Sequence, residues 1–155
     1  MDDLFLARAL HVVAVVGWFG GVWFVTLVIL PAIGRSELPE RRVEAFHRIE
    51  GRFAPQAAFW VLLTGASGFW MTWKMDLWWR FSSPDYWWMW AMLLVWLLFV
   101  LILFIAEPLV IHPLLRREAR NERWHARLQA MHIILSMLGL LTIAGAVAGA
   151  HGWTP

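Results

Sequence analysis

The chain has 155 residues, of which 61% are hydrophobic and only 15% charged, and it contains no cysteine. This composition lies far from that of soluble globular domains, and the lack of cysteine excludes disulfides, CxxC metal sites, CxxCH haem attachment and thiol catalysis. The net charge is +2, and because the basic residues are gathered in short segments between apolar stretches, they indicate membrane topology and predict no nucleic-acid partner.

Four apolar segments follow one another along the chain, and each is long enough to cross a bilayer core of roughly 30 Å as a helix of about 20 residues. These segments are 4–33, 53–73, 86–112 and 128–150. They predict an all-α integral membrane protein, a single domain over residues 1–155 in which four transmembrane helices form a bundle with the lipid bilayer as solvent. The connecting segments 34–52 and 113–127 are expected to be loops, the first with an amphipathic helix over residues 36–50 at the membrane surface.

The basic residues are unevenly distributed between the connecting segments. Residues 34–52 contain five Arg and residues 113–127 contain another five, which leaves three of the 13 Lys and Arg for the rest of the chain. The positive-inside rule then places both loops in the cytoplasm and both termini on the periplasmic side of a bacterial inner membrane.

Tryptophans gather between the second and third apolar segments. The group comprises Trp70, Trp73, Trp78, Trp79, Trp87, Trp88 and Trp90. Such rings favour the headgroup level of a bilayer, so an aromatic belt at the periplasmic surface is the simplest interpretation. A platform for a quinone or a porphyrin, built from the same rings, is the alternative.

Small residues indicate where the helices meet. Gly17 and Gly21 form a GxxxG pattern in the first apolar segment, and Gly145 and Gly149 form another in the fourth. Since apolar surface alone drives no association inside lipid, close backbone approach at such residues must substitute for it. We therefore expect a compact bundle.

Six histidines are the main indication of function, because ionisable groups are costly inside a membrane. His11 lies about two turns into the first segment and His151 ends the fourth, so both belong to the periplasmic side. His112 ends the third segment and His132 lies near the start of the fourth, toward the cytoplasm. Two imidazoles at matched depth on different helices are what a b-type haem requires. The four residues are therefore candidate ligands of haem iron or, in the alternative, of copper or zinc, although a packing seam with interfacial histidines would look the same.

Two acidic residues and a group of methionines bear on the chemistry. Glu107 is the one acidic residue within the apolar segments, and it could orient an imidazole, relay a proton or pair with a loop Arg. Glu50 stands between Arg48 and Arg52 and is expected in a surface ion-pair group. Thioethers toward the periplasmic side could bind Cu(I) or simply fill space. They are those of Met71, Met75, Met89 and Met92.

The chain also carries a family resemblance that covers nearly its whole length. It rests on ALHVVAVVGWFGG at 9–21, FHRIEGRF at 46–53, EPLVIH at 107–112 and TIAGAVAGAHG at 142–152. With these motifs the chain resembles the four-helix membrane proteins grouped with copper-resistance protein D (CopD-like) and the HemJ-type protoporphyrinogen oxidases. The HemJ resemblance implies haem b, oxidation of a porphyrinogen, and a helix-one ligand that matches His11. The second ligand proposed there is a Lys before the last helix, where this chain has RLQAMH at 127–132. The CopD resemblance implies movement of copper across the membrane.

We therefore expect a haem-b-binding membrane redox protein that passes electrons between a quinone or porphyrin-type donor and an acceptor. The candidate ligands are His11, His112, His132 and His151, with Glu107 beside them as an orienting or proton-relay group. If the chain is an enzyme, it would be a haem-dependent oxidoreductase. A copper transport or resistance protein and a non-catalytic assembly subunit are the alternatives, and each of the three could act as a homo-oligomer.

Overall fold

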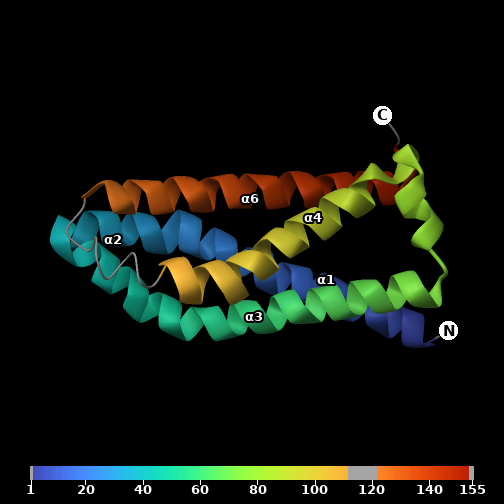
Figure 1. The fold of residues 1–155 in the computed structure, drawn as a ribbon, viewed down its shortest axis with the longest axis horizontal. Coiled ribbons are helices and arrows are strands. Elements are labelled where there is room, and N and C mark those ends of the chain that lie inside the picture. Colours follow the sequence, from blue (N-terminus) through green and yellow to red (C-terminus); the bar gives the residue numbers. More distant parts are fainter. Residues whose placement is uncertain (1, 112–121, 154–155) are drawn as a thin grey trace.

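The computed structural model describes residues 2–111 and 122–153, and the chain folds into long helices that run side by side (Figure 1). No strand occurs in these two ranges, so the predicted all-α class is confirmed. The elements in chain order are α1 (Asp2–Phe24), η1 (Val25–Ile29), α2 (Leu30–Ser36), η2 (Pro39–Arg41), α3 (Arg42–Lys74), η3 (Trp78–Ser82), η4 (Pro84–Tyr86), α4 (Trp87–Leu101), η5 (Ile102–Ile111) and α6 (Glu122–Ala150).

Three of the helical runs are long and apolar enough to cross a membrane. They are Asp3–Ser36, Pro84–Leu109 and Trp124–Ala150. The start of α1 and the end of α6 lie at one end of the molecule, on the right in Figure 1, and we call the opposite end the distal end. The structure thus supports a membrane protein whose apolar helices contact lipid.

The fourth long helix, α3, differs from the other three in its polarity. Its 33 residues begin with a charged stretch and include Gln56, Thr64 and Ser67 in the part predicted to cross the membrane. The helix is therefore less apolar than the three candidate spans, and it is not among them. It nevertheless packs along α1 over much of its length (Figure 1).

The start of α3 also differs from the expected boundary. The helix begins at Arg42 and continues through Pro55, so the amphipathic segment and the second apolar segment form one element. Pro55 removes one backbone hydrogen bond without ending the helix, and such a residue commonly bends a helix. The structure therefore has helix over residues 42–50, as predicted for the amphipathic segment, but this helix begins later than residue 36 and continues into the second apolar segment without a break.

Two π-helical segments interrupt the apolar helices, and each lies beside a proline. η1 ends two residues before Pro31, and η5 contains Pro108. A proline cannot donate its backbone hydrogen bond, and the local widening of a π-helix is one way in which a helix adjusts. In η1 the buried Thr26 donates to Val22 O at 2.7 Å and lies 2.9 Å from Ser136 Oγ on α6, so this segment is tied to the last helix.

The four glycines of the two GxxxG patterns face aromatic rings. A Cβ atom added at Gly17 would come within 2.7 Å of the Trp60 ring, and one at Gly149 would collide with Trp88. The close contacts expected at the GxxxG residues are present, but the partner is a ring instead of a helix backbone. Dispersion between ring and backbone, and not a backbone seam, therefore holds these helices together.

Candidate functional site

A cavity of about 90 Å³ lies in the distal half of the molecule, among α1, α3, η5 and α6. Its lining is mostly apolar, but three ionisable side chains reach it, one from each of three elements: Glu50 from α3, Glu107 from η5 and His132 from α6. A volume of this size has room for several water molecules. We call this cavity with its three ionisable groups the acidic chamber.

Glu50 lies on the face of α3 that lines the chamber. Phe46, Glu50 and Phe53 follow one another at helical spacing and all line the chamber. His47 Nδ1 lies 3.0 Å from Glu50 Oε2, with the two residues one turn apart. Burial first, and then the nearby charge of Glu107, raise the pKa of Glu50 to about 7. At neutral pH this carboxyl group is therefore divided between its protonated and ionised forms.

Glu107 supplies the second carboxylate from the π-helical segment. Its side chain is buried, and Pro108 follows it directly. Its charge acts on Glu50, because both carboxylates line the same small cavity.

His132 contributes a nitrogen base to the chamber. Its Nδ1 lies 3.0 Å from Leu128 O, one turn earlier in α6, and the Phe46 ring meets the imidazole edge-on at 5.9 Å between centroids. A carbonyl oxygen only accepts hydrogen bonds, so Nδ1 carries the hydrogen and Nε2 keeps the lone pair in the neutral ring. The chamber thus contains two carboxylates and one basic nitrogen.

Two buried polar atoms at the chamber lack hydrogen bonds among the described residues. Trp18, only 3% exposed, has no partner for its Nε1–H, and Glu50 Oε2 has none with hydrogen-bond geometry despite the nearby imidazole of His47. One atom is a donor and the other an acceptor, and both belong to residues that line the same cavity. Unpaired buried polar groups are costly, and the chamber has room for water that would supply the missing partners.

His11 forms a second polar site, toward the termini. Its Nδ1 lies 3.1 Å from Thr64 O and 3.0 Å from Ser67 Oγ, both on α3. The Ser67 hydroxyl donates to Leu63 O at 2.6 Å, so Nδ1–H is the donor to these two oxygens. Metal-binding imidazoles are commonly held in this way, with one nitrogen fixed by an acceptor and the other free to bind the metal. His11 Nε2 is thus available as a ligand.

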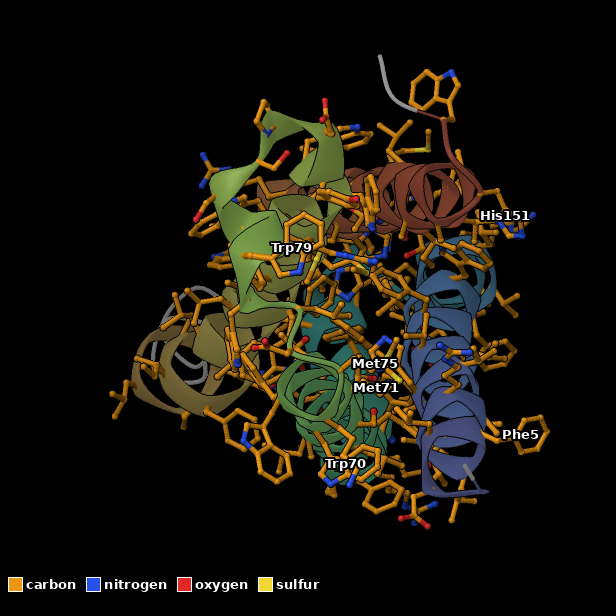
Figure 2. All side chains as sticks on the ribbon, turned by 90° about the vertical axis from the view of Figure 1, so that its right-hand side faces the viewer. Phe5, Trp70, Met71, Met75, Trp79 and His151 are labelled. Carbon is orange, nitrogen blue, oxygen red and sulfur yellow. The ribbon has the colours of Figure 1, made fainter. Side chains whose placement is uncertain are left out.

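The other predicted ligands are placed differently. His112 lies outside the described residues. His151 is exposed at the end of α6, its Nδ1 donates to Val147 O of the same helix at 2.8 Å, and it points away from the other helices (Figure 2). His125 Nε2 donates to Leu30 O at 3.2 Å and so joins α6 to α2.

Two features of the structure test whether a haem or a metal ion fits at these histidines: the grouping of possible ligands and the volume of the chamber. Across residues 2–111 and 122–153, no three His, Asp or Glu side chains are grouped so that they could hold a metal ion. The acidic chamber is also smaller than the roughly 300–1,000 Å³ typical of ligand pockets, so it does not accommodate a porphyrin in this arrangement. A bis-histidine haem inside the chamber therefore does not fit.

The surroundings of Met75 disfavour the binding of Cu(I) at the methionines. Met71 and Met75 lie near each other at the end of α3 (Figure 2), but Arg8 Nη2 approaches Met75 Sδ at 3.8 Å. A guanidinium beside a thioether disfavours binding of a cation at that sulfur. These residues are better explained as packing.

Sequence reasoning missed the place of Glu50. We expected it in a surface ion-pair group with Arg48 and Arg52, but it lines the acidic chamber and its close ionic neighbour is His47. The signal that could have found it is the apolar spacing of Phe46 and Phe53 on the same helical face. That face becomes informative only when α3 is known to begin before residue 50.

Comparison with known proteins identifies no relative, because no family model, no curated protein and no solved structure matches the chain. The CopD-like and HemJ-type resemblance therefore rests on the sequence motifs alone.

Proposed function

We propose that this chain is a four-helix inner-membrane protein that performs a proton-coupled redox reaction, in which Glu50 and Glu107 accept and release the proton. The observation that carries the proposal is the acidic chamber, where carboxylates from two different helices and the basic nitrogen of His132 face one small cavity. Buried ionisable groups within a membrane protein mark proton or ion pathways by default.

The chemistry expected from the sequence requires such a group. Oxidation of a quinol or a porphyrinogen releases protons together with electrons, so the protein needs a group with a pKa near neutrality that can take up and release them. Glu50 meets this condition. Haem b, when bound at His11 Nε2, would supply one-electron chemistry; the chain's own task is to orient that imidazole through Thr64 and Ser67 and to move the proton.

The proposed topology has α3 as the fourth transmembrane helix. The hydroxyls of Thr64 and Ser67 donate to carbonyls of the preceding turn. The Thr64 carbonyl and the Ser67 hydroxyl also accept from His11, so the polar side chains of these two residues are satisfied within the protein. Such satisfaction is what a helix in lipid requires. The two Arg-rich segments would then lie in the cytoplasm with the distal end, and the termini in the periplasm.

The first experiment is an oxidised-minus-reduced optical spectrum of the purified full-length chain from a haem-replete host. We expect a b-type Soret and α-band that His11→Ala abolishes and His125→Ala retains, because His125 only joins α6 to α2 through Leu30. Absence of any band from the wild-type chain, or equal loss of the band in both variants, would refute the haem assignment.

The second experiment counts protons. On reduction at pH 7 in lightly buffered detergent solution, a pH indicator should record proton uptake that Glu50→Gln removes. Glu44→Gln is the matched control, because this residue lies on the same helix and is exposed. Uptake that is the same in all three proteins would place the proton acceptor outside the acidic chamber.

A second candidate function is metal transport, which rests on the sequence resemblance. The carboxylates and the imidazole of the chamber are not grouped so that they could hold a metal ion in this arrangement, so any metal would have to bring them closer together. Metal content of the purified chain that falls in a Glu50→Gln/Glu107→Gln variant, with no optical band in either protein, would favour this function. An assembly role would gain weight if neither metal nor an optical band is found.

A further inference from the structure

A second hollow, with a volume of about 760 Å³, opens on the surface of the distal half. It runs between the segment η1–α2 and the first half of α3. Its apolar part is formed by Ile29 and Ile33 on one side and by Ile49 and Phe53 on the other. We call it the distal groove, and it is distinct from the acidic chamber.

Two arginines give the distal groove its charge. Arg48 and Arg52 both line it, and they lie one turn apart on α3, so their side chains emerge on the same face. Both residues are exposed. Glu37 is the one acidic residue among the lining groups, which leaves the groove with net positive charge.

The position of the groove matches the boundary of the apolar layer. Ser36, the last residue of the first candidate membrane span, belongs to its lining. Ile29 and Ile33 lie within that span, whereas Ile49 and the two arginines belong to the first turns of α3. The groove therefore combines an apolar lining with two positively charged side chains.

We propose that the distal groove binds an anionic phospholipid, with the phosphate at Arg48 and Arg52 and an acyl chain along Ile29, Ile33 and Phe53. Charge complementarity selects the headgroup, because basic side chains at a membrane surface attract anionic lipids. The guanidinium groups can also bind phosphate oxygens in a bidentate manner. A lipid fits better than a free anion, because most of the groove is apolar.

The bound lipid would also lie against the acidic chamber. Ile49 and Phe53 line both hollows, so these two side chains form the partition between them. An acyl chain in the groove would support that partition from the bilayer side. The inference itself is independent of the proposed proton chemistry, because it uses none of the three ionisable groups of the chamber.

The test measures lipid binding by the full-length chain in neutral detergent. Fluorescent phosphatidylglycerol is compared with phosphatidylcholine of the same acyl chains, and we expect the anionic lipid to bind at least about tenfold more tightly. Arg48→Gln/Arg52→Gln should remove that preference. Arg41→Gln/Arg127→Gln is the matched control, because it removes the same charge from exposed residues outside the groove and should retain the preference.

A second variant tests the apolar part without changing any charge. Ala32 is exposed and lines the groove, so Ala32→Trp should fill it and weaken phosphatidylglycerol binding. This variant and the salt dependence of the wild-type chain decide the matter if the double arginine variant does not fold. Equal binding of both lipids by the wild-type chain would overturn the proposal, and so would displacement of the lipid by millimolar inorganic phosphate, which would indicate a site for a free anion.

Discussion

Two regions of the molecule contain a histidine packed between helices, His11 in one and His132 in the other. The two regions differ in how completely their buried polar atoms are hydrogen-bonded. At His11, the imidazole Nδ1 and the Ser67 hydroxyl both find acceptors on α3. At the acidic chamber, the Trp18 N–H is buried without a hydrogen bond to any described residue. The first region is a closed hydrogen-bond network, and the second is an open one.

The difference indicates where solvent and protons can enter. A fully paired network rigidifies a helix contact, whereas an incompletely paired network next to a cavity is completed by water. In the proposed function, the region of His11 positions a ligand and the region of Glu50 exchanges protons. Changes in the two regions should consequently differ in their response to pH.

The largest expected effect concerns the pH dependence of stability. The pKa of Glu50 is raised in the folded chain from 4.5 to about 7, so the folded state binds more protons than the unfolded state between these pH values. The stability of the fold is then highest below pH 4.5 as far as this group is concerned, and it falls as the pH rises through 7, by about 3 kcal/mol at most. Thermal unfolding of the chain in detergent between pH 5 and 8 measures this.

Glu50→Gln should flatten that dependence, because the amide does not titrate. Ser67→Ala, in the region of His11, should leave the slope as it is in the wild-type chain. If the wild-type unfolding temperature does not change between pH 5 and 8, Glu50 does not exchange its proton in the folded chain and the contrast between the two regions is lost.

The next effect concerns the contact between Gly139 on α6 and the Phe19 ring on α1. A Cβ atom at Gly139 would overlap the Phe19 ring, which belongs to the core cluster with Trp18 and Phe99. Gly139→Ala should therefore destabilise the chain by about 1–3 kcal/mol, as overpacking does. Gly20→Ala, with nothing within 4 Å of the added atom, is the control and should be close to neutral. Equal unfolding temperatures for both variants would show that the helices separate easily at this contact.

The sequence predicts some of these features well and others not at all. Three of the four predicted apolar spans follow from length and composition and agree with the candidate spans, because a bilayer demands long apolar helices whatever the protein does. The fourth, residues 53–73, is not among the candidate spans, because α3 is less apolar. Local patterns of this kind do not depend on which helix packs against which.

The acidic chamber could not be predicted, because it depends on three elements that meet only in the folded chain. Glu50 stands between two arginines in the sequence, and only the early start of α3 turns it inward. Glu107 reaches the same cavity from a π-helical segment, whose wider turns do not follow the 3.6-residue period on which sequence patterns rest. The sequence alone therefore does not predict that Glu50 and Glu107 line the same cavity.

A smaller effect is expected at the network around His11. Ser67→Ala removes one hydrogen-bond partner of the imidazole and leaves the other, Thr64 O, in place. The loss of stability should be about 1 kcal/mol, measured by chemical unfolding in detergent. Ser82→Ala is a suitable control, since that residue is exposed in η3. A loss equal to that of the control would mean that the hydroxyl does not fix the ring.

The smallest effect is expected at His151, and it sharpens the comparison because this residue belongs to neither region. The imidazole is exposed and donates only to a carbonyl of its own last turn, so His151→Ala should change the free energy of unfolding by less than about 0.5 kcal/mol. The optical band that His11→Ala abolishes should persist in this variant. If His151→Ala removed the band as well, the two histidines would share one haem, and the end of α6 would have to move toward α1 when the haem binds.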